Sequence, residues 1–156
     1  MSDEPPPLEP AAVLFACNLN FVRSPMATAL LRHLAGNRIF VDSCGLRRMP
    51  PPDEDEPEEH VDPFAAAVMA EIDCDLSTHR AKTFDELEDS SFDLVISLTP
   101  EAQHRAVELT RGRAAEIEYW PTLDPTLTEG SREARLAAYR EVRDTLAARI
   151  AARFGA

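Results

Sequence analysis

Short apolar runs alternate along this chain with segments that carry apolar residues at helical spacing. The apolar runs, which are candidate strands, cover residues 11–16, 38–43, 92–97 and 116–119. The helical patterns cover residues 25–36, 62–72, 100–110 and 132–154. The first run is continuously apolar, as expected of a strand that is buried on both faces of a sheet. Alternation of strands and helices predicts an α/β fold in three layers, with a parallel sheet between two layers of helices.

The segment between the first strand and the first helix is the expected ligand site. Ser24 precedes Pro25 at the predicted helix start, where serine suits the N-cap and proline suits the first turn. Gly36 suits the end of the same helix. In open parallel sheets, ligands bind at the carboxyl ends of strands beside helix N-termini, and this segment occupies such a position.

Two segments stand outside the alternation of strands and helices. Residues 1–10 are acidic and rich in proline, and we expect a disordered tail there, followed by one domain over residues 11–156. Residues 49–59 contain four prolines and six acidic residues, which predicts an exposed loop. If that loop lies on the rim of the site, it repels acidic phosphoproteins and favours a basic partner or a small substrate.

Charge and composition exclude several classes of function. A net charge of −12 disfavours nucleic acid as a partner, because such binding needs a cationic surface. No apolar run reaches the length of about 20 residues that a membrane span needs, and no secretory signal is evident. Three cysteines are too few for a disulfide scaffold, which favours a cytoplasmic protein with reduced thiols. Neither zinc-spaced cysteine pairs nor a glycine-rich nucleotide motif occurs, so we expect no metal and no cofactor.

The strongest candidate chemistry lies in the loop that follows the first strand. Cys17 and Arg23 are six positions apart, a spacing that lets a short loop surround one phosphate-sized oxyanion. Backbone N–H groups and the helix N-terminus would stabilise a Cys17 thiolate and a bound phosphate together. Arg23 would hold two phosphate oxygens, and the Ser24 hydroxyl would donate a hydrogen bond to the thiolate. The predicted phosphate-binding residues are Asn18, Leu19, Asn20, Phe21, Val22, Arg23 and Ser24.

A proton donor is expected near the far end of the chain, at Asp124. Trp120, Pro121 and Pro125 flank it and predict a fixed, partly desolvated carboxyl. Cys17 would displace the leaving group to form a cysteinyl-phosphate, which water then cleaves, and Asp124 would serve as acid and then as base. Two structural alternatives stay open, a buried structural cysteine at position 17 and a turn-capping aspartate at position 124.

These residues resemble the low-molecular-weight protein tyrosine phosphatases and the arsenate reductases that share their fold. Residues 17–26 read CNLNFVRSPM, which is similar to the family loop Cys-x-Gly-Asn-x-Cys-Arg-Ser-Pro-Met. The resemblance continues through DSCG at 42–45, DLSTHRA at 75–81, FDLVI at 92–96 and Asp124-Pro125. It implies a four-stranded parallel sheet in the order 2-1-3-4, with Cys17 as nucleophile, Arg23 as phosphate clamp and Asp124 as general acid. It also implies that Asn20 adopts a left-handed conformation held by Ser43 and His79.

The loop departs from the family pattern at three positions. Leu19 replaces a glycine, so the loop is strained if that position requires a positive φ. Val22 replaces a cysteine that could trap an oxidised Cys17 as a disulfide. Phe21 stands where relatives that cleave phosphoarginine carry threonine, and its ring suits an aryl phosphate better.

The sequence therefore favours hydrolysis of protein phosphotyrosine or of a small aryl phosphate, with inorganic phosphate as product or inhibitor. One alternative is an arsenate reductase that uses an external thiol, since Cys44 and Cys74 are expected to be buried and no cysteine follows them. Another is an oxyanion- or protein-binding module with weak catalysis, if Leu19 distorts the loop.

Overall fold

The computed structural model describes residues 10–50, 55, 59–87 and 91–155, and its centre is a parallel sheet. The strands are β1 (Ala12–Cys17), β2 (Phe40–Gly45), β3 (Leu94–Ser97) and β4 (Glu116–Tyr119). Their order is β2-β1-β3-β4, and every neighbouring pair is parallel, so the predicted four-stranded sheet and its order are confirmed. The second strand begins two residues later than predicted because a short 3-10 turn, η1 (Gly36–Arg38), follows the first helix.

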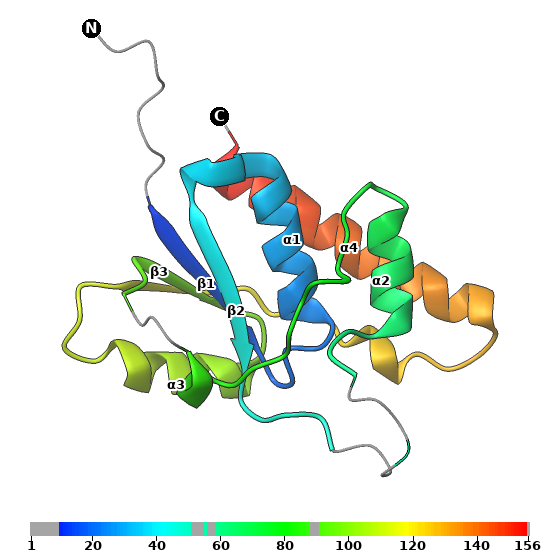
Figure 1. Ribbon diagram of the computed structural model, residues 1–156, viewed down its shortest axis with the longest axis horizontal. Coiled ribbons are helices and arrows are strands. Elements are labelled where there is room, and N and C mark those ends of the chain that lie inside the picture. Colours follow the sequence, from blue (N-terminus) through cyan, green and yellow to red (C-terminus); the bar gives the residue numbers. More distant parts are fainter. Residues whose placement is uncertain (1–9, 51–54, 56–58, 88–90, 156) are drawn as a thin grey trace, which may run out of the picture.

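Within the described residues, four α-helices cover the sheet in two layers (Figure 1). They are α1 (Arg23–Ala35), α2 (Pro63–Ala70), α3 (Pro100–Thr110) and α4 (Arg132–Phe154), with short 3-10 turns η2 (Phe84–Glu86) and η3 (Pro125–Leu127). Helices α1, α2 and α4 lie on one side of the sheet, and α3 lies on the other. The three-layer α/β/α architecture is therefore confirmed.

Alternation of side chains along β1 creates two separate apolar cores. Phe15 packs with residues of α1, α2 and α4, whereas Leu14 and Ala16 pack with residues of α3. Successive side chains of a strand point to opposite faces, so a strand covered on both faces must be apolar throughout. This explains why the first run carries no polar residue before Cys17.

Helix α4 closes the first of these cores. Its apolar stripe is buried at every position predicted: Leu136, Tyr139, Val142, Leu146, Ile150 and Phe154. The stripe follows the helical period and faces α1 and α2, which both contact α4. None of the helices in the described ranges is both long enough and apolar enough to cross a membrane.

The predicted N-cap at Ser24 is wrong. Helix α1 begins at Arg23, Val22 occupies the cap position, and no side chain caps the helix there. The side chains of Cys17, at the end of β1, and Asn20, in the following loop, hold the Ser24 hydroxyl instead, so it is not available to cap the helix. Gly36 does end the helix, with a φ of 58° that suits glycine.

The predicted tail at residues 1–10 lies outside the described residues, apart from Pro10. Most of the predicted loop at 49–59 also lies outside them. Met49, Pro50, Asp55 and Glu59 are described, and none of them belongs to a helix or strand. Pro50, Asp55 and Glu59 are exposed as predicted, whereas Met49 is partly buried.

Candidate active site

A loop of five residues, 18–22, joins the end of β1 to the start of α1 and holds Cys17 against Ser24. The Cys17 Sγ lies 2.9 Å from the Ser24 Oγ, and both side chains are buried. The Ser24 Oγ also accepts a hydrogen bond of 2.8 Å from the Asn20 Nδ2. Because a hydroxyl has one hydrogen and the amide nitrogen can only donate, the serine proton is left for the sulfur. The arrangement therefore suits a thiolate at Cys17.

Asn20 is the most heavily bonded residue of the loop. It is fully buried and has a φ of 55°, a left-handed conformation that asparagine tolerates. Its Nδ2 donates to the Ser43 Oγ at 2.9 Å, and its Oδ1 accepts from the Lys82 backbone N–H at 3.0 Å. Its carbonyl lies 2.9 Å from the His79 Nε2, which must be the donor because a carbonyl only accepts. Ser43 and His79, the two residues that the family resemblance places around Asn20, thus both bond it.

Leu19, which replaces the glycine of the family loop, does not have the positive φ that would strain a leucine. Among the described non-glycine residues, only Asn20 and Asp73 have a positive φ. The Leu19 side chain is partly buried and packs against the larger core. A glycine is therefore not needed at this position, and the loop closes with a leucine in it.

The loop is also tied to the ends of two other elements. The Asn18 carbonyl accepts from the N–H groups of Leu46 and Arg47, at 2.8 and 3.1 Å, just after β2. The Asn18 Oδ1 accepts from the Thr99 Oγ1 at 2.6 Å, and Thr99 in turn caps helix α3. Thr99 was not among the predicted site residues, although the Thr99-Pro100 pair is a helix-start signal of the same kind as Ser24-Pro25.

Arg23 and Asp124 approach each other at the mouth of the loop. The Arg23 Nη1 donates to the Thr122 carbonyl at 3.0 Å, and the Arg23 Nη2 lies 3.9 Å from the Asp124 Oδ2. The other oxygen, Asp124 Oδ1, accepts from the Thr126 backbone N–H and hydroxyl. The Asp124 side chain is 31% exposed, so one carboxylate oxygen is held in place while the other faces the arginine and solvent.

Cys17, Arg23 and Asp124 line one pocket of about 290 Å³. Apolar side chains and a threonine form most of the remaining wall: Leu19, Phe21, Val22, Met49 and Thr126. Phe21 and Val22 are buried in the larger core, so they present only a small part of their surface to this space. The pocket thus combines a thiol and an arginine with an apolar wall.

Asp62 also lines this pocket and was not predicted as a site residue. Its Oδ1 caps α2 by accepting from the N–H groups of Phe64 and Ala65, and its Oδ2 accepts from the Tyr139 hydroxyl at 3.0 Å. Burial raises the pKa of Tyr139, and the neighbouring Asp62 carboxylate adds to this effect. Both Asp62 oxygens are therefore engaged in joining α2 to α4. The Asp62-Pro63 pair is the sequence signal for this cap.

The other two thiols lie outside the pocket. All three cysteines of the chain are free and buried. Burial raises the pKa of both the Cys44 and the Cys74 thiol, which keeps them in the unreactive form. Within the described ranges, no cluster of histidine, cysteine and acidic residues is arranged to hold a metal ion.

Comparison with known proteins agrees with this geometry. A sequence profile described as low molecular weight phosphotyrosine protein phosphatase matches residues 12–152. The arsenate reductase of Halalkalibacterium halodurans is 30% identical over 139 residues, which are 88% of this chain and 91% of that protein. An arsenate reductase solved in its phosphate-binding state has a TM-score of 0.69 at 27% identity, covering 89% of this chain and 92% of the other. The tyrosine phosphatase Wzb of Escherichia coli K30, solved with sulphate, shares the fold, with a TM-score of 0.67, 19% identity and coverage of 92% and 97%.

Substitution of Gly45 by alanine tests whether the end of β2 supports the loop. An added Cβ would lie 2.7 Å from the Asn20 nitrogen and 2.8 Å from the Leu19 carbonyl carbon, which are backbone atoms that cannot move independently. We expect Gly45→Ala to destabilise the fold by about 1–3 kcal/mol in urea denaturation and to weaken binding of inorganic phosphate.

Gly112→Ala is the matched control, because its Cβ meets no atom within 4 Å but sits at a φ of 77°. That variant should lose stability through backbone strain and keep phosphate binding. Equal phosphate affinity in Gly45→Ala and wild type would contradict the proposed support.

The acid stability of the chain tests the state of His79. Burial lowers the pKa of His79, and the cations Lys82 and Arg32 act in the same direction. The unfolded chain therefore takes up a proton near pH ~6.5 that the folded chain resists, and stability falls as the pH drops below that value. Because glutamine keeps an N–H donor for the Asn20 carbonyl but does not titrate, His79→Gln should lose less stability between pH 7 and 5.

Urea denaturation at several pH values measures this difference. His104→Gln is the control, because His104 is 82% exposed. Parallel acid profiles for wild type and His79→Gln would show that His79 does not titrate as described.

Proposed function

Because the chain belongs to the low molecular weight phosphotyrosine protein phosphatase family, we propose that it hydrolyses protein phosphotyrosine or a small aryl phosphate. The observation that carries this proposal is that the Asp124 carboxyl shares one pocket with Cys17 and Arg23. A thiol and an arginine alone suit any oxyanion, whereas a carboxyl beside them supplies the proton that an ester's leaving oxygen needs.

The first chemical step forms a covalent intermediate. The phosphate lies in the loop of residues 18–22, held by backbone N–H groups and by the Arg23 guanidinium. The Cys17 thiolate attacks phosphorus, the bond to the ester oxygen breaks, and Asp124 donates its proton to that oxygen. The N–H groups and Arg23 stabilise the charge on the equatorial oxygens during the transfer.

The second step releases phosphate. Asp124, now a carboxylate, takes a proton from a water molecule that attacks the phosphorus of the cysteinyl-phosphate. The S–P bond breaks, and the Ser24 hydroxyl stabilises the departing thiolate through its 2.9 Å contact with the Cys17 Sγ. Inorganic phosphate is the product and, because it fits the same loop, a competitive inhibitor. Side chains and the backbone of this chain perform both steps.

The pocket wall supports an aromatic leaving group. Leu19, Phe21 and Met49 present apolar surface beside Cys17, and the part of Phe21 that reaches the pocket can contact a substrate ring. A phosphotyrosine side chain or a small aryl phosphate matches this surface better than a strongly hydrated leaving group does. A cytoplasmic location, where the Cys17 thiol stays reduced, belongs to the same proposal.

Arsenate reduction is a second candidate, because curated relatives of similar length carry that name. Reduction of arsenate requires two electrons, and therefore two thiols that end as a disulfide. Cys44 and Cys74 are buried, with raised pKa values, and no cysteine follows Cys74 in the sequence. An external thiol would have to complete the reaction, which makes phosphate ester hydrolysis the better-supported function.

Hydrolysis of two phosphate esters tests the role of Asp124. Phenol is a poorer leaving group than p-nitrophenol and depends more on protonation. Asp124→Asn should therefore lower kcat/KM, which reports the step that releases the leaving group, about 100-fold or more for phenyl phosphate and less for p-nitrophenyl phosphate. Asp85→Asn is the matched control, since the Asp85 side chain is 89% exposed and forms a surface ion pair with Arg105. An equal loss of kcat/KM for the two esters would show that Asp124 is not the general acid. Turnover by Cys17→Ser at the wild-type rate would contradict the whole mechanism.

Arsenate consumption distinguishes the second candidate. We expect no reduction of arsenate above background when the chain is supplied with glutathione or mycothiol, because neither Cys44 nor Cys74 lines the pocket of Cys17 and burial raises the pKa of both thiols. The assay follows arsenite formation under conditions in which p-nitrophenyl phosphate is hydrolysed. Arsenite produced at a rate that matches or exceeds ester hydrolysis, and lost in Cys17→Ser, would replace the phosphatase proposal with the reductase.

A further inference from the structure

A groove lies next to the catalytic pocket, between residues 121–128 and helix α4, and we call it the α4 groove. Its volume is about 410 Å³. The α4 residues that line it are Ala138, Glu141, Val142 and Thr145. Asp124 lines both the groove and the pocket of Cys17, whereas Cys17 and Arg23 line the pocket and not the groove. The α4 groove therefore continues the catalytic pocket beyond the proposed general acid.

Two leucines of the α4 groove are open to solvent. Leu123 is 78% exposed and Leu127 is 77% exposed, more than any other large apolar residue that the structure describes. Single exposed apolar residues are ordinary on a protein surface, but these two line one groove together with the buried Val142. A partner that covers the two leucines removes apolar surface from water, which favours binding.

The shared Asp124 indicates which molecule covers the leucines. When a phosphotyrosine side chain occupies the pocket, the main chain that carries it emerges beside residues 121–128, which contribute to both the pocket and the groove. An extended chain advances about 3.3 Å per residue. Residues close to the phosphotyrosine therefore reach Leu123 and Leu127, which lie within three positions of Asp124. A small aryl phosphate has no flanking residues and leaves both leucines exposed.

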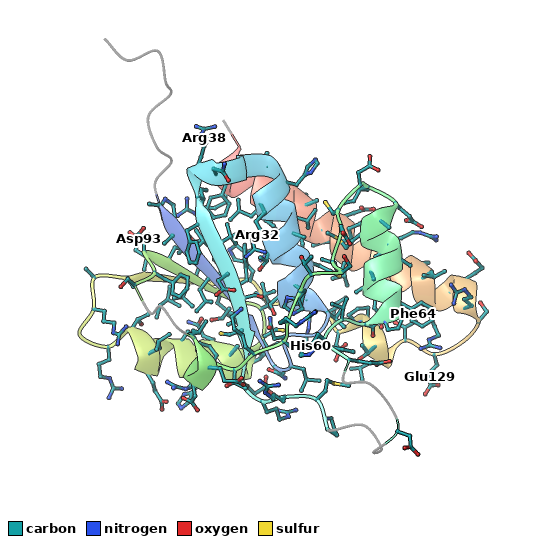
Figure 2. All side chains as sticks on the ribbon, in the orientation of Figure 1. Arg32, Arg38, His60, Phe64, Asp93 and Glu129 are labelled. Carbon is teal, nitrogen blue, oxygen red and sulfur yellow. The ribbon has the colours of Figure 1, made fainter. Side chains whose placement is uncertain are left out.

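Acidic side chains lie beside the leucines. The two charged residues that line the groove are Asp124 and Glu141. Glu129 follows the lining residue Thr128, is exposed, and lies on the loop that leads into α4 (Figure 2). The net charge of the whole chain is −12. The groove therefore attracts a basic side chain next to the apolar one and repels an acidic side chain.

The arginines at the start of α4 do not neutralise the groove. The guanidinium carbons of Arg132 and Arg135 lie 5.3 and 4.5 Å from the centre of the Phe64 ring. Phe64 belongs to α2, which packs against α4, and Figure 2 shows it at one end of α2. Neither arginine lines the groove, so the charge there stays negative.

We propose that the α4 groove binds the residues that flank the phosphotyrosine of a protein substrate, with an apolar side chain on Leu123 and Leu127 and a basic side chain near Glu141. This inference rests on the proposed phosphatase function and deepens it, because it selects a phosphorylated polypeptide over a small aryl phosphate. The groove takes no part in the chemistry. It supplies binding energy away from the reacting atoms, which raises kcat/KM for a peptide relative to a small ester.

Peptide binding tests the groove without turnover, in a Cys17→Ala background that has no nucleophile. Fluorescence anisotropy compares two labelled phosphotyrosine peptides, one with leucine on both sides of the phosphotyrosine and one with serine there. The leucine peptide should bind about tenfold more tightly or better, because burial of one leucine side chain supplies at least that factor. The combined changes Leu123→Ser and Leu127→Ser should remove this preference.

Leu34→Ser is the matched control for the loss of an exposed leucine. Leu34 is 46% exposed near the C-terminal end of α1, whereas the loop 18–22 joins the N-terminal end of that helix. The preference for the leucine peptide should persist in this variant. In the charge test, Glu141→Gln should reduce the preference for lysine over glutamate beside the leucines about twofold or more.

Turnover separates this inference from the proposed function. The ratio of kcat/KM for the leucine peptide to kcat/KM for p-nitrophenyl phosphate should fall about tenfold in the double leucine variant and stay unchanged in Leu34→Ser. If the chain hydrolysed neither ester, the proposed function would fail, and the peptide preference measured in Cys17→Ala would still decide the role of the groove.

Two results would overturn the peptide groove directly. They are equal affinity of Cys17→Ala for the leucine and serine peptides, and a preference for the leucine peptide that survives the loss of both leucines. Dimerisation of the wild-type chain that is lost in the double leucine variant would assign the leucines to a second copy of the chain and would also contradict the proposal.

Discussion

The buried amide of Asn20 is the constraint on which the site depends. A non-glycine residue at a φ of 55° is unfavourable by about 1–3 kcal/mol, and such strain persists only where the surroundings hold it. Four groups do so here, the Ser24 and Ser43 hydroxyls, the Lys82 backbone N–H and the His79 ring. At about 1 kcal/mol of net stabilisation for each hydrogen bond, these contacts offset the strain.

The same network determines the chemistry of Cys17. Asn20 donates to the Ser24 Oγ, so the serine has only its own hydrogen to offer and directs it to the sulfur. One chain of hydrogen bonds therefore links the nucleophile to the rest of the fold. It runs from Ser43 of β2 and from His79 to Asn20, then to Ser24 and to Cys17 at the end of β1. Apolar packing of Leu19, Phe21 and Val22 completes the loop, which explains why neither the glycine nor the second cysteine of related loops is needed for closure.

Local sequence patterns predicted those helices and strands whose apolar residues follow directly from which of their faces are buried. The continuous apolar run of β1 and the stripe of α4 are set by burial on known faces, and both are found as expected. The spacing of Cys17 and Arg23, between a strand and a helix start, located the loop, because those residues are close together in the sequence. Contacts between distant segments were not predictable in this way. Thr99 reaches Asn18 from 81 positions away, and Ser24 left its expected capping role because Cys17 and Asn20 bind its hydroxyl.

The central claim is that Cys17 carries the phosphoryl group during turnover, and trapping that intermediate tests it most directly. Asp124→Asn should slow hydrolysis of the cysteinyl-phosphate, because the asparagine cannot take a proton from water. Rapid acid quenching of this variant with p-nitrophenyl phosphate, followed by peptide mass spectrometry, should find phosphate on the peptide that contains Cys17. Release of nitrophenol without phosphate on Cys17, or with phosphate on the peptides of Cys44 or Cys74, would contradict the account.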